Sequence, residues 1–441
     1  MEITIEKLVY GGDGLARLEQ PDGKRKTVFV PLVLPGERVD ATIVEERTGF
    51  ARAKLDRVVE PSPLRIGPAC PYFGECGGCH YQHTSYEEQL KLKGEILRET
   101  VARIAKVELP EIETHASPPL HYRNRTRMKF AIVAGDGTKF AIGYHKMGSH
   151  ELLATHECPI SSPLINRALG ALWEMAAETD LPKGIAEVEF FADDEDKNLL
   201  LEFLTEADFD KRAATKFAEA LQERVKEIVG VAAVARPRNV NEAVAAPELE
   251  GETAEDAVIL TGRKYLDCKV GEFSYRVSAG SFFQTNRHVT SKLLELVCSG
   301  AKGKLAMDLY AGVGLFTLPL AQEFERAVAV ETAGASFADL KSNAPRNAKT
   351  IEATTERFLA RATGKPEFVV VDPPRAGLGK KVVSGLTKLA PKSMVYVSCD
   401  PSTLARDLPG LIAGGYRVVK ADMVDLFPQT FHIETVLRME R

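Results

Sequence analysis

Two short apolar runs near the end of the chain restrict its fold more than any other feature. Phe368–Val371 reads FVVV and Met394–Val397 reads MVYV, and a helix-length segment separates them. Continuous apolar runs of this length are typical of parallel strands buried on both faces of a sheet. Asp372 follows the first run and Cys399 comes two residues after the second. Because the carboxyl ends of parallel strands line the ligand crevice of an open α/β sheet, we expect this carboxylate and this thiol in one crevice.

A second signal in the same half predicts a site for a nucleotide-like cofactor. The strand expected at 305–309 carries Asp308 and leads through Tyr310 into a Gly-Val-Gly turn that starts at Gly312. Glycines let the backbone approach a ligand closely. The next strand ends in Glu331, about twenty residues on, where an acid can bind ribose hydroxyls. Because the third glycine of the dinucleotide fingerprint is missing, the pattern favours S-adenosylmethionine.

Three motifs of this half resemble the RNA (uracil-5)-methyltransferase family. They are D-P-P-R at 372–375, S-C-D-P at 398–401 and F-P-Q-T-F-H-I-E-T at 427–435. The resemblance covers nearly the whole chain and implies a Rossmann-like, S-adenosylmethionine-dependent methyltransferase domain. It assigns cofactor contacts to Gln284, Tyr310, Glu331 and Asp372, to which the glycine turn adds Gly312.

The resemblance also implies a reaction, methyl transfer to carbon 5 of a uridine in RNA. That carbon is a poor nucleophile, which covalent catalysis overcomes. Cys399 would add to carbon 6, and Glu434 would later remove the carbon 5 proton so that elimination frees the cysteine. Asp372 would bind the uracil edge, and Gln284 would serve both cofactor and base. A lone cysteine after a buried strand is more often an inert core residue, and only the accompanying motifs reverse that reading.

The sequence departs from the family pattern at three positions near these residues. Position 311 is Ala where Cys is common, 400 is Asp where Asn is usual, and 429 is Gln where His is frequent. The carboxylate of Asp400 is expected to raise the pKa of the neighbouring Cys399 thiol, so another group must assist thiolate formation.

The N-terminal part reads as a small barrel. Residues 1–60 alternate apolar and polar positions between turn signals at 11–14, 21–23 and 34–37, which is typical of a small closed β-barrel. The segment resembles a TRAM domain, a barrel found on RNA-modifying enzymes. The alternative is an accessory barrel without a partner.

Three cysteines follow in one glycine-rich loop, at Cys70, Cys76 and Cys79. Thiolates at this spacing can converge on a metal centre, for which Cys158 is the candidate fourth ligand. Disulfides are not expected in a reducing compartment. Zinc remains a competitor, since histidines lie nearby. The family resemblance favours a 4Fe-4S cluster held by the four cysteines, as a structural element or an aid to RNA binding.

A basic segment follows between the third and fourth cysteines. In a strand, Arg123, Arg125, Arg127 and Lys129 would share one face, and such a row suits RNA phosphates. The alternative is a solvated edge strand that discourages aggregation. The net charge of -5 for the whole chain hides this local excess.

These features divide the 441 residues into three predicted domains. They are the barrel at 1–60, a central α+β domain with the cysteines at 61–270, and the Rossmann-like methyltransferase domain at 271–441. Residues 242–256 read as an exposed excursion. With no apolar run near eighteen residues and no secretory signal, we expect a cytoplasmic monomer without a membrane partner.

The RNA target stays open between 23S ribosomal RNA, which the barrel and cluster favour, and transfer RNA. Two rival functions also remain. One is a cytosine-5 RNA methyltransferase, disfavoured because its usual nucleophile sits in a different motif. The other is a non-catalytic RNA-binding or iron-sulfur sensor protein, which has no need for Cys399 together with Glu434.

Overall fold

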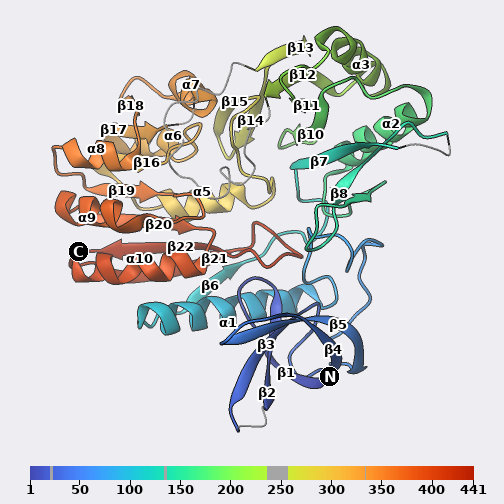
Figure 1. The fold of residues 1–441 in the computed structure, drawn as a ribbon. Coiled ribbons are helices and arrows are strands. Elements are labelled where there is room, and N and C mark those ends of the chain that lie inside the picture. Colours follow the sequence, from blue (N-terminus) through green and yellow to red (C-terminus); the bar gives the residue numbers. More distant parts are fainter. Residues whose placement is uncertain (20–22, 134–136, 236–256, 333) are drawn as a thin grey trace.

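Three bodies make up the protein in this computed structural model (Figure 1). The structure describes residues 1–441 except 20–22, 134–136, 236–256 and 333. The predicted excursion at 242–256 therefore lies outside the described residues. In the described part of the chain, no helix is both long enough and apolar enough to cross a membrane.

The first body is the barrel that the sequence predicts. Its strands are β1 (Glu2–Leu8), β2 (Asp13–Glu19), β3 (Arg25–Pro31), β4 (Arg38–Glu46) and β5 (Phe50–Glu60). They close in the order β1-β2-β3-β5-β4. Alternate residues of each strand point inward, and valine, isoleucine and alanine side chains fill the interior. The barrel packs beneath helix α1 in Figure 1.

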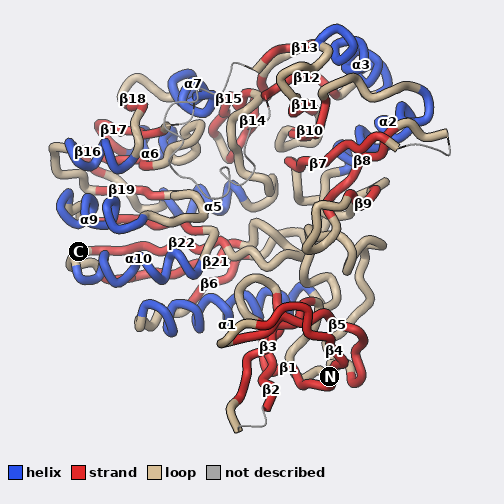
Figure 2. Tube along the Cα trace, viewed as in Figure 1, coloured by secondary structure: helices blue, strands red, loops and turns tan. Residues whose placement is uncertain are grey.

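In the described part of the chain, the second body is a seven-stranded sheet with helices α2 (Pro163–Glu178) and α3 (Lys211–Arg224) (Figure 2). In spatial order its strands are β13 (Val258–Gly262), β12 (Ile228–Ala235), β11 (Leu199–Thr205), β10 (Ile185–Ala192), β7 (Arg125–Ile132), β8 (Phe140–His145) and β9 (Leu152–Ala154). A hairpin of β14 (Tyr265–Val270) and β15 (Phe273–Ser278) leads on to the third body.

The third body is an eight-stranded sheet of the doubly wound kind. Its spatial order is β18 (Ala348–Glu352), β17 (Phe324–Glu331), β16 (Gly303–Leu309), β19 (Phe368–Val371), β20 (Ser393–Ser398), β22 (Glu434–Glu440), β21 (Arg417–Val424) and β6 (Ile112–His115). The strands from β18 to β20 run parallel, and β22 is antiparallel to β20. The helices are α5 (Thr290–Cys298), α6 (Thr317–Glu323), α7 (Gly334–Asn343), α8 (Thr355–Arg361), α9 (Gly379–Leu389) and α10 (Pro401–Ala413).

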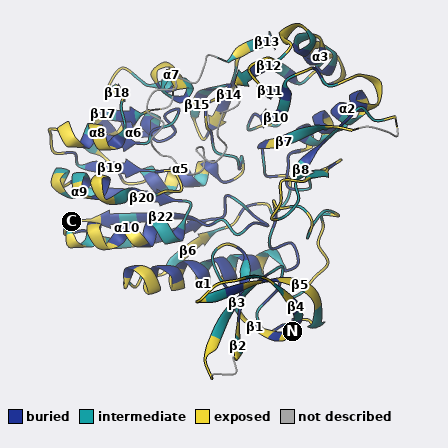
Figure 3. Cartoon of the chain, viewed as in Figure 1, coloured by how far each residue is buried: buried dark blue, intermediate teal, exposed yellow. Residues whose placement is uncertain are grey.

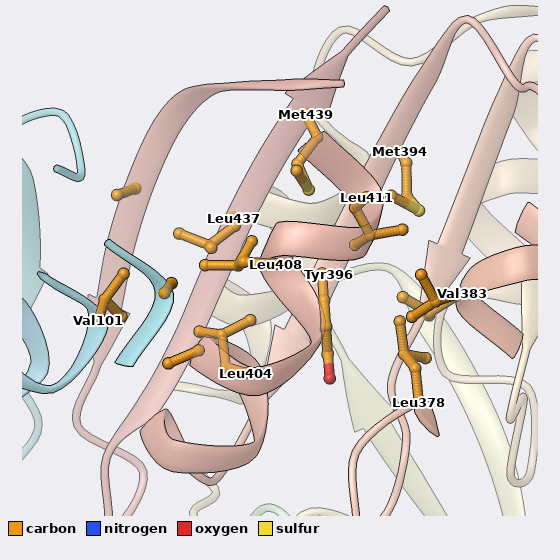
Figure 4. Packing of buried hydrophobic residues seen from close by; sticks show 14 of the residues in the cluster. Val101, Leu378, Val383, Met394, Tyr396, Leu404, Leu408, Leu411, Leu437 and Met439 are labelled. Carbon is orange, nitrogen blue, oxygen red and sulfur yellow. The ribbon is translucent and has the colours of Figure 1, made fainter. Parts of the chain in front are cut away.

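Two elements that the sequence assigns to the central domain pack with this third body. β6 pairs in parallel with β21 at the edge of the sheet, and α1 (Tyr86–Ala105) covers the same end. Leu97 and Val101 of α1 join one apolar cluster with Leu404 and Leu408 of α10 (Figure 4). The third body therefore contains residues that the sequence assigns to the central domain.

Burial follows these layers (Figure 3). All four residues of β19 are buried, and so are five of the six residues of β20. This confirms the two buried parallel strands from which the prediction of an α/β sheet started. The helices expose their outer faces, so the polar residues at the strand ends are the groups placed to meet a ligand.

Candidate functional site

The carboxyl edge of the third sheet brings together the residues predicted to be catalytic. Asp372 follows β19, which pairs with β20, and Cys399 follows β20. Glu434 begins the antiparallel strand β22, where Ser398 pairs with Thr435. One antiparallel strand inserted beside parallel ones thus puts the start of β22 at the same edge as the ends of β19 and β20.

Burial and mutual repulsion perturb the carboxyl groups at this edge. Burial and the nearby Asp308 raise the pKa of Asp372 to about 7. Burial, with a further contribution from Asp372, raises the pKa of Glu434 well above its usual range. Carboxyl groups that lie close together with little access to water repel one another when ionised, so ionising all of them costs free energy. Strongly perturbed acids in a crevice are typical of functional sites.

The Cys399 thiol is disfavoured as a thiolate in the free protein. Burial, followed by the charges of Glu434 and Asp372, raises its pKa to about 12, and Asp400 adds to this. The direction predicted for Asp400 is confirmed, although its contribution is the smallest. The Arg375 guanidinium acts in the opposite direction and lowers the pKa of Cys399. Arg375 of the D-P-P-R motif is therefore a group that assists thiolate formation.

Asp400 has a structural use that accounts for an acid at this position. It is the N-cap of α10, where its Oδ1 accepts from the backbone N–H groups of Ser402 and Thr403 at 2.8 and 3.1 Å. Pro401 follows at the first helical position, which suits a helix start. The cap fixes the backbone just after Cys399.

The glycine turn and Glu331 meet at the neighbouring strand ends. The Gly312 N–H donates to Glu331 Oε2 at 2.8 Å, and Tyr310 before it has a positive φ of 67°. A Cβ built on Gly312 would meet no atom within 4 Å, whereas one on Gly314 would approach Leu340 at 3.0 Å. Gly314 therefore serves packing, while Gly312 faces open space of the kind that a bound cofactor would fill.

Asp308 is a site residue that the sequence pattern located without assigning it a role. It is the second-to-last residue of β16, next to the glycine turn, and its Oδ2 accepts from Thr317 Oγ1 at 2.5 Å. Its Oδ1 is buried without a hydrogen-bond partner among the described residues. Burial raises the pKa of Asp308 to about 7, and the charge of Glu331 adds to this. A buried acid with one oxygen left without a partner, beside an open turn, fits a site for a cationic ligand.

Gln284 lies on a different wall from these acids. With Asn124, Cys268 and Phe283 it lines a cavity of about 150 Å³ between the central sheet and the third body. The segment around it is held by buried hydrogen bonds from Asn286 to Leu426 and from Ser281 to Asp339. The structure therefore joins Tyr310, Gly312 and Glu331 in one group but leaves Gln284 beside another cavity.

The loop that leads to Glu434 is anchored from three sides. The buried Lys93 ammonium of α1 binds Asp425 at 2.7 Å and the Phe427 carbonyl at 3.0 Å. Gln89 Nε2 donates to Gln429 Oε1 at 2.9 Å, and the Gln429 backbone N–H donates to Gln89 Oε1 at 3.1 Å. The first bond gives the side chain of Gln429, which departs from the family pattern, a structural role.

The third anchor comes from the cysteine loop. The backbone N–H groups of His80 and Tyr81, directly after Cys79, donate to the Gln429 carbonyl at 2.8 and 3.0 Å. Gln429 itself has a positive φ of 69°. The placement of Glu434 therefore depends on the fold of the cysteine loop, and no pattern in the sequence predicts this dependence.

The four candidate metal ligands line one cavity of about 320 Å³, formed by Cys70, Cys76, Cys79, Cys158 and their neighbours. Burial raises the pKa of the Cys76 thiol to about 11 and that of Cys79 to about 12. No three of the four sulfur atoms, all of them in the described part of the chain, lie within 4.8 Å of one another. Four thiolates on a single zinc ion stand about 3.8 Å apart.

The predicted row of phosphate-binding arginines is wrong in its central member. Arg125 is buried, where it pairs with Glu189 and, at 3.3 Å, with Glu202. Arg123 lines the cysteine cavity. Arg127 is half exposed and binds Glu189 at 2.7 Å. Arg125, Arg127 and Lys129 share one face of β7, but acids of the adjacent strand β10 and of β11 beyond it pair with them. Arg123 lies before the strand.

Together the doubly wound sheet, the glycine turn and the acids at its carboxyl edge define an S-adenosylmethionine-dependent methyltransferase. Residues 85–441 match the family model described as tRNA (Uracil-5-)-methyltransferase, and residues 1–55 match that of the TRAM domain. The chain therefore belongs to the RNA uracil-5-methyltransferase family and carries a TRAM domain.

Curated relatives match along the whole chain. The 23S rRNA (uracil(1939)-C(5))-methyltransferase RlmD of Halomonas elongata is 32% identical, over 100% of this chain and 89% of its own length. RlmD of Pectobacterium atrosepticum is 31% identical over 99% and 92%. The tRNA (uracil-54, C5)-methyltransferase of Pyrococcus abyssi, solved with S-adenosyl-L-homocysteine, shares the fold at a TM-score of 0.73 and 22% identity, with 100% of each chain covered.

Proposed function

We propose that this protein methylates carbon 5 of a specific uridine in 23S ribosomal RNA. The observation that carries the chemistry is the meeting of Cys399, Asp372 and Glu434 at one edge of the sheet. The RNA class rests on the RlmD relatives, which are similar along the whole chain. The TRAM domain supports an RNA substrate, and we propose that the protein works as a cytoplasmic monomer.

S-adenosylmethionine, when bound, supplies a methyl group on a positively charged sulfonium. The wall that would hold it is formed by Tyr310, Gly312 and Glu331. Asp308 lies beside this wall, and its Oδ1 has no hydrogen-bond partner in the described part of the chain. These residues fit a cationic cofactor, because Gly312 leaves open space and Asp308 offers an acceptor oxygen. We propose that Gln284 and Asp372 also contact the cofactor.

The proposed reaction starts with the Cys399 thiolate, which Arg375 helps to form. It adds to carbon 6 of an unstacked uracil and leaves electron density on carbon 5, which takes the methyl group. Glu434 then accepts the carbon 5 proton, and elimination breaks the bond to Cys399. Glu434 must be ionised to accept this proton, and a carboxylate whose pKa is raised is then a stronger base than an ordinary one. Asp372 would bind the uracil edge.

The test separates the two ends of this cycle. Cys399→Ala should bind RNA and cofactor but transfer no methyl group. Glu434→Gln keeps the nucleophile and loses the base, so one methyl transfer should occur and stop. The stalled product is protein covalently joined to methylated RNA, seen as a shifted band on a denaturing gel.

Two further variants make the result decisive. The band should vanish in the double variant Cys399→Ala/Glu434→Gln. Cys298→Ala, a control on helix α5, should turn over normally. Normal turnover by Glu434→Gln, or an adduct in the double variant, would refute the assignment of the two residues.

We further propose that Cys70, Cys76, Cys79 and Cys158 hold a 4Fe-4S cluster. One cavity collects all four cysteines, and the spacing of their sulfur atoms exceeds that of a single zinc site. A cluster provides one iron atom for each thiolate and so accepts a wider set of ligands. The cluster would fix the loop that hydrogen-bonds Gln429.

Anaerobic purification tests the cluster. We expect a brown protein with about four irons and four labile sulfides per chain. Cys158→Ser should lose iron as completely as Cys76→Ser, while Cys268→Ser, a buried cysteine of β14, should keep it. One zinc ion per chain without sulfide would exclude the proposal.

A transfer RNA substrate is the second candidate, because the matching family model is described by that substrate. Mapping of 5-methyluridine in ribosomal and transfer RNA from a deletion strain distinguishes the two. Loss of 5-methylcytidine instead would favour a cytosine-5 enzyme, and no loss of any methylated nucleoside would favour a non-catalytic role.

A further inference from the structure

The turn between β1 and β2 projects one barrel side chain, Tyr10, into the catalytic edge. The turn is closed by a hydrogen bond from the Val9 N–H to the Asp13 carbonyl at 2.9 Å. Gly12 has a φ of 93°, and a Cβ built on it would approach the His80 ring at 3.0 Å. The turn therefore fits closely against the cysteine loop, and glycine is required for that approach.

Tyr10 contacts the backbone of the nucleophile directly. Its hydroxyl donates to the Cys399 carbonyl oxygen at 3.2 Å. Its ring meets Phe431 edge-on, with ring centres 5.5 Å apart and planes at 87°. Phe431 precedes Glu434 by three residues. One barrel residue thus contacts the loops of both proposed catalytic groups.

The hydroxyl of Tyr10 is suited to donate. Burial, followed by the negative charge of Asp400, raises the pKa of Tyr10, so the phenol stays neutral. Asp400 in turn accepts from the first N–H groups of α10. The backbone at Cys399 is therefore held from one side by the barrel and from the other by a helix N-terminus.

We infer that Tyr10 is a positioning residue, which holds the Cys399 loop in the geometry needed for attack and so makes the nucleophile depend on the docked barrel. The inference rests on the proposed function of Cys399. The competing explanation is that Tyr10 merely docks the barrel, as Lys7 does by pairing with Glu99 of α1.

Tyr10→Phe tests the inference, because it removes the hydroxyl and keeps the ring against Phe431. The first readout is the rate at which iodoacetamide alkylates Cys399, followed peptide by peptide by mass spectrometry across pH. It needs no RNA. Loss of one neutral hydrogen bond should slow alkylation roughly 3- to 10-fold at pH 8 and move its pH profile upward. The second readout is methyl transfer, where kcat should fall by a similar factor while KM and Kd for RNA stay unchanged.

Lys7→Gln is the matched control, since it weakens the same interface without touching Cys399. It should leave both readouts unchanged. Equal effects in the two variants, an unaltered alkylation profile in Tyr10→Phe, or a change confined to RNA affinity would each overturn the inference. If the wild-type protein methylates no RNA, the proposed function fails, but the alkylation profile still decides the role of Tyr10.

Discussion

Replacing Asp308 by Asn should alter the pH dependence of stability in the free protein. Burial raises the pKa of this carboxyl from its ordinary 3.8 to about 7. The folded protein therefore binds the proton more tightly than the unfolded chain does. Asp308 consequently lowers stability as pH rises from about 4 through about 7, and the full penalty is present above that range.

The magnitude follows from the two pKa values. The penalty from Asp308 is roughly 4 kcal/mol at pH 8 and between about 1 and 2 kcal/mol at pH 5. Asn removes it at both values but leaves an amide unpaired at Oδ1, which costs about 1–3 kcal/mol at any pH. Because this cost is the same at both pH values, it cancels when the change in unfolding free energy at pH 5 is subtracted from the change at pH 8. We expect Asp308→Asn to gain roughly 2–3 kcal/mol more at pH 8 than at pH 5.

Urea unfolding of the cofactor-free protein, followed by circular dichroism at both pH values, measures this difference. Asp267→Asn is the control, because it removes an exposed carboxylate from β14. An equal change at pH 5 and pH 8 for Asp308→Asn would show that the carboxyl is not held protonated by burial. The same result in both variants would also refute the reasoning.

Other predictions concern charge. Arg375→Gln should slow alkylation of Cys399 at pH 8, since the guanidinium lowers the pKa of this thiol; an unchanged rate would mean that another group assists it. Arg125→Ala should lower the free energy of unfolding by about 3–5 kcal/mol, because it leaves the buried Glu202 without its ion-pair partner. Arg127→Ala should cost less than about 1 kcal/mol in urea unfolding, and a larger loss would contradict its half-exposed position. In salt titrations of RNA binding, Arg127→Ala should reduce the slope by roughly one unit or less, and no reduction would exclude a phosphate contact.

The sequence predicts correctly those residues whose place depends on a strand pattern, either the apolar run or alternation of a strand or the polar residues at its end. Apolar runs with Asp372 and Cys399 behind them define a buried parallel pair, because both faces of such strands are covered. The barrel was equally predictable from alternation and turn residues.

The missed features depend on contacts between distant segments. The alternation of faces along a strand placed Arg125 on the correct face. It could not reveal that Glu189 lies on the next strand, β10, and Glu202 on the strand beyond it, β11. Tyr10 reaches Cys399 from the other end of the chain, and a lone tyrosine in a turn carries no signal of this. The pairing of β6 with β21 likewise has no local pattern, because an edge strand of four residues is too short to show one.

That last pairing has a consequence for how the protein is made. A ribosome releases α1 and β6 long before it synthesises β21 and α10, against which they pack. The apolar stripe of α1 must therefore wait, exposed or chaperoned, through most of translation. The active-site sheet closes only with its final strand β22, which begins with Glu434. A nascent or truncated chain would therefore have no complete active site, and folding should be slow because its key contacts are among the longest-range in the chain.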